Sequence, residues 1–408
     1  MNCFPFRGWR YHPERFPNPE EIISPPYDVY TDREACEMQA RSPYHFSHII
    51  RNQTPGNTRY SRAADLLREW RQSGILIQDN HPGFTLLSQT ASANRRPVTR
   101  LGLIASLQLE ALGTSILPHE KTIPKHIEDR YRLLEAAQAQ TGQIFLIYEE
   151  SARTVDRLAT EFESQTPLMQ FTLDGIETKL WAVTDPNRIQ TIQAALIPAQ
   201  AIIADGHHRY KTAWQYFQNH PTHPGAGQVM VTLVNSANPG LEILPTHRLV
   251  RNHTVTLEAL RKALHPGDSA PAIHPATSIL EFWNQRTTPQ IGVVDLRGET
   301  GFLSEVPSSD TETPLMPVCY VHDAILEPVL RLSIQRNADL DNIAYHKGTP
   351  ALSDLAILKE KYRFLFLVPP PAIEDVFQVT RQGAILPQKS TYFYPKVYSG
   401  MVIRTFGD

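Results

Sequence analysis

The sequence predicts an α/β protein with mixed sheets, built from more than one domain. Short apolar runs of strand length alternate with longer stretches whose apolar residues recur at the spacing of one helix face. The clearest case is the apolar run 201–204, which is followed by apolar residues at helical spacing between Tyr210 and Phe217. The length of 408 residues is typical of two or three domains.

Composition excludes several classes of protein. Apolar residues make up 41% of the chain, which is enough for buried cores and too many for a disordered protein. The formal net charge of −3 argues against a nucleic-acid binder that depends on bulk positive charge. No apolar run has the length of a membrane span, and the first residues lack the apolar core of a signal peptide. Cys3, Cys36 and Cys319 lie far apart without metal-ligand spacing, so we expect reduced thiols in a cytoplasmic protein.

The first part of the chain is predicted to contain an extended arm over 1–30, two helices and four strands. A capping-box pattern that begins at Thr31 starts a helix that runs to about residue 41. Apolar residues on one face between Tyr60 and Trp70 predict a second helix, which Gly74 ends. The predicted strands are 44–50, 75–78, 84–89 and 99–109, with a polar turn around Asn94 between the last two.

The remainder alternates in the same way and is predicted to divide into further parts. A helix begins in the polar stretch 118–130 and stops near Gly142. The later elements are strands at 144–148, 201–204, 228–234 and 241–244 (the last two neighbours around the turn 238–240), helices at 257–264, 277–285 and 321–332, a hairpin of 291–295 and 302–306, and strands at 364–368 and 392–394. We expect an N-terminal α/β domain over 1–250, a spacer subdomain over 251–312 and a C-terminal α/β segment over 313–408 that helps to close the site.

The stretch Ala204-Asp205-Gly206-His207-His208-Arg209-Tyr210 is the strongest candidate for a functional site. Gly206 allows a sharp bend, and Asp205 can bond to the free N–H groups of the first helical turn. Those N–H groups point outward beside Arg209, with His207 and His208 at the same helix end. An Asp-Gly turn before a helix is often only a structural junction. Three bulky, solvating side chains in one turn favour an anion site, most naturally for phosphate.

Two upstream stretches carry groups that could act at such a site. Tyr27 and Asp28 follow two prolines that restrict the backbone, and alone they indicate a rigid loop. His119, Glu120 and Arg130 belong to a stretch dense in titratable groups, which is equally typical of a solvated loop and helix entrance.

Two downstream stretches are further candidates. His247 and Arg248 at a strand end either complete a basic pocket or form a surface turn. Lys389 and Ser390, with Thr391, hold a phosphate through charge and hydroxyl groups, or else begin a solvent-facing strand.

Four segments in this order together resemble a large prokaryotic family known mainly as a domain of unknown function. They are Ser24-Pro25-Pro26-Tyr27-Asp28-Val29, His119-Glu120 with Asp129-Arg130, the 204–210 stretch with Leu244-Pro245-Thr246-His247-Arg248, and Lys389-Ser390-Thr391-Tyr392-Phe393-Tyr394-Pro395-Lys396. The Asp-Gly-His-His-Arg element is also similar, more distantly, to the phosphate-binding motif of the ParB/sulfiredoxin-type fold, which includes nucleotide-binding partition proteins and a free serine kinase.

This resemblance implies a ParB/sulfiredoxin-like phosphate-binding core with additional α/β subdomains, and a nucleotide, ATP or ADP, bound at 205–209. It also implies that Glu120, or after it Asp28, acts as the base, as a glutamate upstream of the motif does in the kinase. It points to serine or phosphoserine as the small hydroxyl metabolite.

The predicted reaction is phosphoryl transfer by a kinase or phosphatase, which needs charge neutralisation and positioning more than covalent help. Glu120 would take or relay a proton, and Asp205 either binds Mg²⁺ or only caps the helix. Phosphate oxygens would be held by Arg209, His207, His208 and the Gly206 backbone. The nucleotide site would also include His247, Arg248, Lys389 and Ser390. The residues expected to face the substrate are Tyr27, Asp28, His119 and Arg130. The expected partner is a small phosphorylated molecule, with neither nucleic acid nor membrane.

Two alternatives stay open. A non-catalytic nucleotide-binding regulatory protein would use the same phosphate site without turnover. A metal-dependent hydrolase would use His119, His126, His207 and His208, but adjacent histidines on a helix point about a quarter turn apart, which makes shared ligation awkward. The sequence therefore predicts no metal site.

Overall fold

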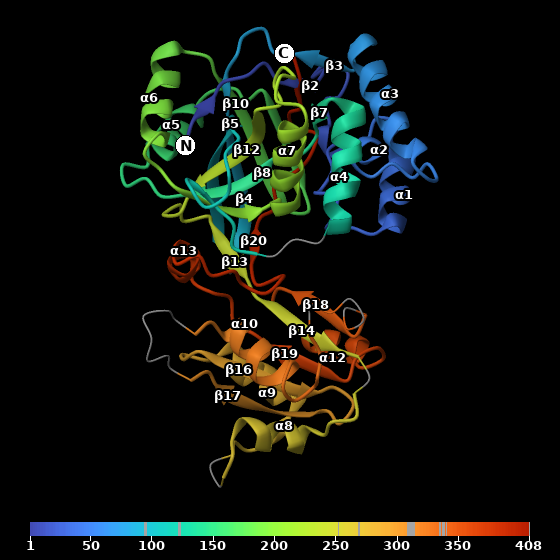
Figure 1. The fold of residues 1–408 in the computed structure, drawn as a ribbon, viewed down its shortest axis with the longest axis vertical. Coiled ribbons are helices and arrows are strands. Elements are labelled where there is room, and N and C mark those ends of the chain that lie inside the picture. The colour runs from blue at the N-terminus through green and yellow to red at the C-terminus, as the bar shows by residue number, and fades with distance from the viewer. Residues whose placement is uncertain are drawn as a thin grey trace. The chain divides into compact units, whose positions relative to one another are not determined.

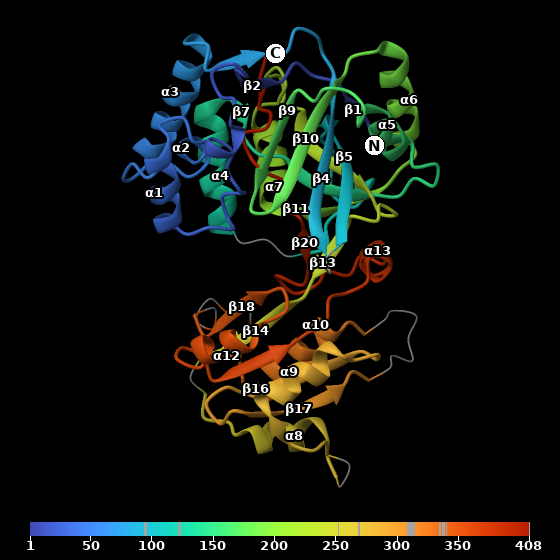
Figure 2. The ribbon, with the colours of Figure 1, turned by 180° about the vertical axis from the view of Figure 1, so that it is seen from behind.

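The computed structural model describes residues 1–93, 96–120, 124–251, 253–267, 270–307, 315–333, 336, 339 and 341–407. The chain forms two compact units (Figures 1 and 2). Unit 1 comprises Met1–Pro118, Thr122–Glu242 and Pro395–Asp408, and unit 2 comprises His119–Lys121 and Ile243–Tyr394. These boundaries differ from the predicted ones at 250 and 312, because strands on both sides of residue 312 pair in one sheet of unit 2.

Unit 1 is organised around a nine-stranded mixed sheet with the order β6-β11-β8-β12-β5-β4-β10-β9, in which β1 also pairs with β5. β8 runs parallel to β12 and antiparallel to β11. All five residues of β8 are buried, as the continuous apolar run predicts. The bounds are β1 Cys3–Phe4, β4 Phe84–Ala93, β5 Arg96–Gln108, β6 Ile116–Leu117, β8 Ile144–Tyr148, β9 Met169–Leu173, β10 Ile176–Val183, β11 Ala201–Asp205 and β12 Gln228–Asn235.

Helices surround this sheet and bring distant segments together. Ala159, Ile192 and Tyr210, from three different helices, share one apolar core with the strands. Figure 1 shows α3, α4 and α7 side by side. The bounds are η1 Pro19–Glu21, α1 Asp32–Arg41, α2 Ser47–Ile50, α3 Thr58–Gln72, α4 Pro124–Ala137, α5 Thr154–Phe162, α6 Pro186–Leu196 and α7 His207–Asn219; two small sheets pair β2 Trp9–Tyr11 with β3 Leu76–Gln78 and β7 Ala139–Gln140 with β21 Arg404–Thr405.

Unit 2 has a six-stranded sheet with the order β15-β17-β16-β19-β14-β18. Trp283 and Leu280 of α9 pack on Val294 and Leu365 of this sheet. The bounds are β14 Thr246–Val250, β15 His274–Pro275, β16 Gln290–Asp295, β17 Thr300–Glu305, β18 Ile343–Lys347, β19 Phe364–Leu367, α8 Leu257–Leu264, α9 Ala276–Asn284, α10 Pro317–Tyr320, the π-helix η2 Val321–Leu326, α12 Leu352–Leu358 and α13 Ile373–Arg381, with β13 Glu242–Leu244 paired to β20 Tyr392–Tyr394. Within the described ranges, no helix combines the length and apolar character that crossing a membrane requires.

The α/β class with mixed sheets is confirmed, and so is the capping box at Thr31, but three predicted elements are wrong. Residues 44–50 contain the short helix α2 and no strand, since short apolar runs do not distinguish the two. The helix expected at 321–332 ends at Leu326, because Pro328 has no N–H to continue it. β12 and β13 are not neighbours, since β12 pairs with β5 and β8. The predicted turn at Asn94 lies outside the described residues.

Candidate functional site

The predicted strand, turn and helix are present where β11 meets α7. β11 ends at Asp205, and α7 begins at His207. Gly206, rather than Asp205, holds the N-cap position, with a φ of +95°. This left-handed conformation favours glycine, and it turns the chain sharply enough for a side chain one helical turn later to fold back over it.

That side chain is Arg209, which is held from two sides. Its Nη2 donates to Oδ2 of Asp205 at 3.1 Å, and its Nη1 donates to the carbonyl of Gln143. Nζ of Lys396 lies 3.7 Å from the other carboxylate oxygen of Asp205. One carboxylate therefore faces two cations, which leaves a local formal charge of +1 (two positive groups and one negative). We call Arg209, Asp205 and Lys396 the Asp205 triad.

We expect Gly206→Ala to destabilise the protein and to displace Arg209. A left-handed conformation costs a residue with a Cβ about 1–2 kcal/mol, and a Cβ at 206 would lie 3.1 Å from Nε of Arg209. Gly175→Ala is the matched control, since Gly175 has a φ of +75° with no atom within 4 Å of the added Cβ. Both variants should lower the denaturation midpoint, and only Gly206→Ala should weaken phosphate binding. Equal binding by the two variants would contradict this role of Gly206.

Arg209 lines a narrow pocket of about 60 Å³ in unit 1. The side chains of Arg130, Thr212 and Ser399 line the same pocket, as does Gly142. A Cβ at Gly142 would lie 3.3 Å from Nη1 of Arg209, so the missing side chain keeps the backbone close to the guanidinium. Because one water occupies about 30 Å³ in the liquid, this space suits a single small group such as a phosphate.

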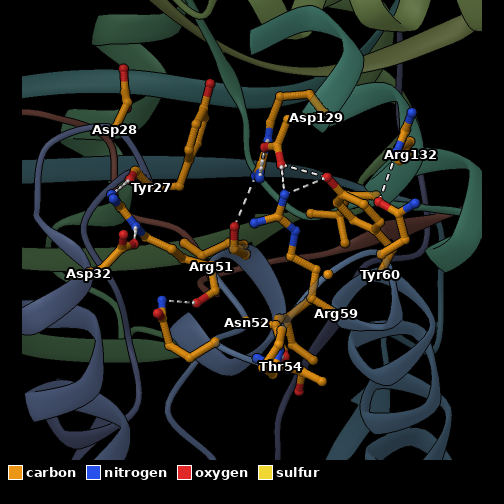
Figure 3. Close-up of a pocket in the computed structure, with 18 of the residues that line it drawn as sticks. Tyr27, Asp28, Asp32, Arg51, Asn52, Thr54, Arg59, Tyr60, Asp129 and Arg132 are labelled. Atoms are coloured by element: carbon orange, nitrogen blue, oxygen red, sulfur yellow. Dashed lines mark hydrogen bonds and ion pairs between the residues drawn. The ribbon is translucent and has the colours of Figure 1, made fainter. Parts of the chain in front are cut away.

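A wide pocket of about 780 Å³ (Figure 3) shares part of its lining with the narrow one and so adjoins it. Tyr27, Ile50, Arg130 and Leu133 line both pockets. Cζ of Arg130 lies 4.0 Å from the centroid of the Tyr27 ring, within cation–π range. The volume is typical of a small-molecule site. The structure therefore brings parts of all four motif segments, 24–29, 129–130, 204–210 and Lys396, to one region of unit 1.

Asp129 contacts two arginines that line the wide pocket, much as Asp205 contacts Arg209 of the narrow pocket. Nε of Arg130 donates to Oδ2 of Asp129 at 2.8 Å, and Nη2 of Arg59 lies 3.5 Å from Oδ1. Burial alone would raise the pKa of Asp129, but the charge and hydrogen bonds of Arg130, a hydrogen bond from Tyr60 and the charge of Arg59 lower it. We call Arg59, Asp129 and Arg130 the Asp129 triad, which also has a local formal charge of +1.

Tyr27 lies close to charged groups of both triads, and Asp28 follows it in the chain. Burial raises the pKa of the Tyr27 hydroxyl, while the charges of Arg130 and Arg209 lower it and those of Asp28 and Asp205 raise it. Asp28 is exposed and lines the wide pocket. The predicted substrate-facing residues Tyr27, Asp28 and Arg130 are therefore close together.

The two histidines of the motif lie differently from the prediction. The side chain of His207 is buried, and His208 is partly exposed. Neither is among the described residues that line the narrow or the wide pocket. Phosphate binding by these imidazoles therefore stays a prediction, and Arg209 and Arg130 are the cations that line the narrow pocket.

Glu120 and His119 belong to unit 2, beside Lys389 and Thr391. The carboxylate of Glu120 accepts hydrogen bonds from the N–H and hydroxyl of Thr391, at 3.3 and 3.2 Å, and from the N–H of Lys389 at 3.4 Å. His119 is buried, with Nε2 2.8 Å from the Thr391 hydroxyl. Ser390 is also buried, and its hydroxyl donates to the carbonyl of Pro387 within the same turn.

His247 and Arg248 are core residues of unit 2 and not a surface turn. Both side chains are fully buried. Burial, together with the charges of His346 and Arg248, lowers the pKa of His247 to about 3, so this imidazole is neutral near pH 7. Arg248 donates to the carbonyls of Thr246 and Gln388 and to Nε2 of His322. All five residues of β14 are buried, and β14 lies between the strands β18 and β19, a position that the local sequence did not reveal.

Within the described part of the chain, no group of three or more histidine, cysteine, aspartate and glutamate side chains is placed to hold a metal ion. The side chain of His126 lies outside that part. His119 belongs to unit 2, whereas His207 and His208 belong to unit 1.

Sequence reasoning missed one cation of the Asp205 triad and two residues that line the pockets. Lys396 ends a motif segment that we had noted, but the prediction placed the phosphate contact at Lys389. Ser399 and Arg59 carried no local signal, because a lone serine near a chain end and an arginine at a helix start are ordinary surface residues.

Unit 1 is thus an α/β unit with two adjoining pockets that arginine side chains line. A model of the family described as "Protein of unknown function (DUF1015)" matches residues 3–314, and the chain belongs to this family. This confirms the predicted membership of a family of unknown function.

Solved structures show only a distant likeness. A free serine kinase variant in complex with ADP aligns with a TM-score of 0.38 and 9% identity, covering 71% of this chain and 87% of that one. A conserved hypothetical protein from Pyrococcus furiosus aligns with a TM-score of 0.37 and 10% identity, covering 74% and 95%. C-terminally truncated SbnI from Staphylococcus aureus aligns with a TM-score of 0.36 and 12% identity, covering 74% and 83%. None of the curated proteins compared with the chain matches it.

Proposed function

We propose that unit 1 binds the phosphate of a small phosphorylated molecule, and that the protein is a phosphoryl-transfer enzyme, a kinase or phosphatase, for a small hydroxyl metabolite such as serine or phosphoserine. The observation that carries the proposal is that Arg130 and Arg209, from two separate motif segments, line the same narrow pocket. The relation of this core to the ParB/sulfiredoxin-type fold is part of the proposal.

The chemistry of the narrow pocket fits a phosphate. Each guanidinium has five N–H donors in a planar fork that matches phosphate oxygens, and hydrogen bonds between charged groups are stronger than neutral ones. Thr212 and Ser399 add hydroxyl groups to the same lining. Phosphoryl transfer depends on this kind of charge neutralisation and positioning.

A nucleotide, ATP or ADP, is the proposed cofactor. The volume of the wide pocket and the arginines that line both pockets fit its phosphates and its bulk. Asp205 fits poorly as a Mg²⁺ ligand, because one carboxylate oxygen accepts a hydrogen bond from Arg209 and the other faces Lys396. The role of Glu120 as general base comes from the sequence resemblance.

A non-catalytic nucleotide-binding regulatory protein is the second candidate, and one observation favours it. Asp129 faces two arginines, whose charges and hydrogen bonds lower its pKa and make it a weak proton acceptor. Binding without turnover would then be the function of unit 1.

Isothermal titration with inorganic phosphate, AMP and ADP tests phosphate binding, which both candidate functions require. Charge-assisted hydrogen bonds contribute about 1.5–3 kcal/mol each, so Arg209→Ala should raise Kd about 10- to 100-fold. Arg188→Ala is the control, since Arg188 forms an ion pair with Glu161 on unit 1 and lies outside both pockets. If Arg209→Ala binds these ligands as tightly as the parent protein, the phosphate site is not at Arg209.

A further inference from the structure

We infer that the ligand carries a second anionic group, a phosphate or a carboxylate, which binds at the Asp129 triad while its first phosphate binds at Arg209. This inference rests on the proposed phosphate site and adds the class of ligand. It makes Arg59, which no motif contains, a residue that selects ligands with two anionic groups.

The two triads repeat one electrostatic arrangement. In each, a single carboxylate faces two cations: Asp205 faces Arg209 and Lys396 at 3.1 and 3.7 Å, and Asp129 faces Arg130 and Arg59 at 2.8 and 3.5 Å. The three charged groups of each triad sum to +1. Two separate anionic groups on one ligand, one at Arg209 and one at Arg59, would complement these charges.

Arg130 connects the two locations, because it lines the narrow pocket with Arg209 and also the wide pocket with Arg59. It is held firmly: Nη1 donates to the carbonyl of Ile50 at 2.9 Å, and Asp129 holds the opposite edge. A ligand that passes Arg130 from one pocket to the other reaches both triads.

Arg59 is the cation of the Asp129 triad that is available to a ligand. Its side chain is 45% exposed, against 12% for Arg130, and its distance to Asp129 is the longer of the two. Figure 3 shows Arg59 extending from α3 toward Asp129. The hydroxyl of Tyr60 accepts a hydrogen bond from Arg59 and donates one to Asp129, which orients both groups.

The other charges of the wide pocket do not offer an equivalent site. Arg51 pairs with Asp32 at 2.9 Å, and Arg132 pairs with Glu128 at 2.7 Å, so each of these cations has its own carboxylate. Asp28 adds a negative charge, but Figure 3 shows it well apart from Arg59 and Asp129. The positive excess is therefore local to the triad.

The test compares Kd for inorganic phosphate, pyrophosphate and 3-phosphoglycerate by isothermal titration. We expect the parent protein to bind one or both of the last two at least about tenfold more tightly than phosphate. Tighter binding of pyrophosphate identifies a second phosphate, and tighter binding of 3-phosphoglycerate identifies a carboxylate. Arg59→Gln should remove this preference and leave inorganic phosphate binding unchanged, whereas Arg59→Lys should keep part of it.

Arg62→Gln is the matched control, since Arg62 lies on the same helix, is 48% exposed, pairs with Glu69 at 3.2 Å and lies outside both pockets. It should bind all three probes as the parent does. Two outcomes would overturn the inference and leave the phosphate site standing. In the first, the parent protein binds phosphate but shows no preference for pyrophosphate or 3-phosphoglycerate. In the second, Arg59→Gln keeps the parent's preference. If the parent protein binds none of the probes, the phosphate site itself fails.

Discussion

Glu120→Gln is expected to lower turnover by about 10²–10⁴-fold, the usual cost of a lost general base, while leaving ligand affinity nearly unchanged. The carboxylate accepts hydrogen bonds from Thr391 and from the N–H of Lys389, and the amide oxygen of glutamine can still accept such bonds. Local structure should therefore survive the substitution, and only the ability to take a proton is lost. The measurement is phosphate release or product formation from ATP with serine, or from phosphoserine.

Glu110→Gln is the matched control for this experiment. The carboxylate of Glu110 also accepts hydrogen bonds from backbone N–H groups and a hydroxyl, those of Ser115 and Ile116. Like Glu120 it lines neither the narrow nor the wide pocket, but no motif segment contains it. It should keep full turnover. Parent-level turnover in Glu120→Gln would remove Glu120 from the reaction. A parent protein that binds nucleotide without any turnover would favour the regulatory candidate.

The second large effect is a loss of stability in acid, caused by His247 and His322 in unit 2. Burial, with the charges of His346 and Arg248, lowers the pKa of His247 to about 3, and burial with the charge of Arg248 lowers that of His322 to about 3. Each ring already accepts a hydrogen bond, from the N–H of Val368 and from Arg248, so neither can gain a proton without losing a contact.

The direction of this pH dependence follows from the histidine pKa of about 6.5 in the unfolded chain. Between pH 6.5 and 3 the unfolded chain binds more protons than the folded one. The stabilising contribution of the two neutral histidines is therefore complete above pH 6.5, and the free energy of unfolding decreases as the pH falls below that value. Each histidine contributes a slope of up to about 1.4 kcal/mol per pH unit. Urea denaturation at pH 7.5, 6 and 5, followed by circular dichroism, measures it.

His322→Gln should reduce this slope, because glutamine keeps an acceptor for Arg248 and cannot titrate. His81→Gln changes an exposed histidine and should retain the parent's slope. A His322→Gln protein whose unfolding free energy falls with pH as steeply as the parent's would show that His322 is not protonated on unfolding.

Local patterns predicted the parts of the fold that depend on neighbouring residues. The β11–α7 junction and the helix start at Thr31 are confirmed, because caps, turns and helical faces are set within a few residues. The strand predicted at 44–50 is wrong, because a short apolar run does not determine whether it forms a strand or a helix. The predicted pairing of β12 with β13 is also wrong, because strand pairing depends on distant segments.

The same division applies to the site. Arg209 and Arg130 were predicted from their motifs, and both line the narrow pocket. Their partners were not predictable: Lys396 and Arg59 reach the triads from segments far away in the sequence. His247 had a basic neighbour and a strand-end position that indicated a pocket, but the adjacent strands bury it, and a buried imidazole loses its charge.

The division of unit 1 into three chain segments has a consequence for the order of folding. Its last segment, Pro395–Asp408, follows all of unit 2 in the sequence, yet it supplies Lys396 to the Asp205 triad, Ser399 to the narrow pocket and the strand that pairs with β7. Domains generally fold during synthesis from the N-terminus. Here a nascent chain must extend past all of unit 2, into residues 395–408, before the phosphate pocket can be completed. Until then Asp205 and β7 lack contacts that close loops of some 190 residues or more. Long-range closure of this kind slows folding, so unit 2 can be native while the ligand site is still unfinished.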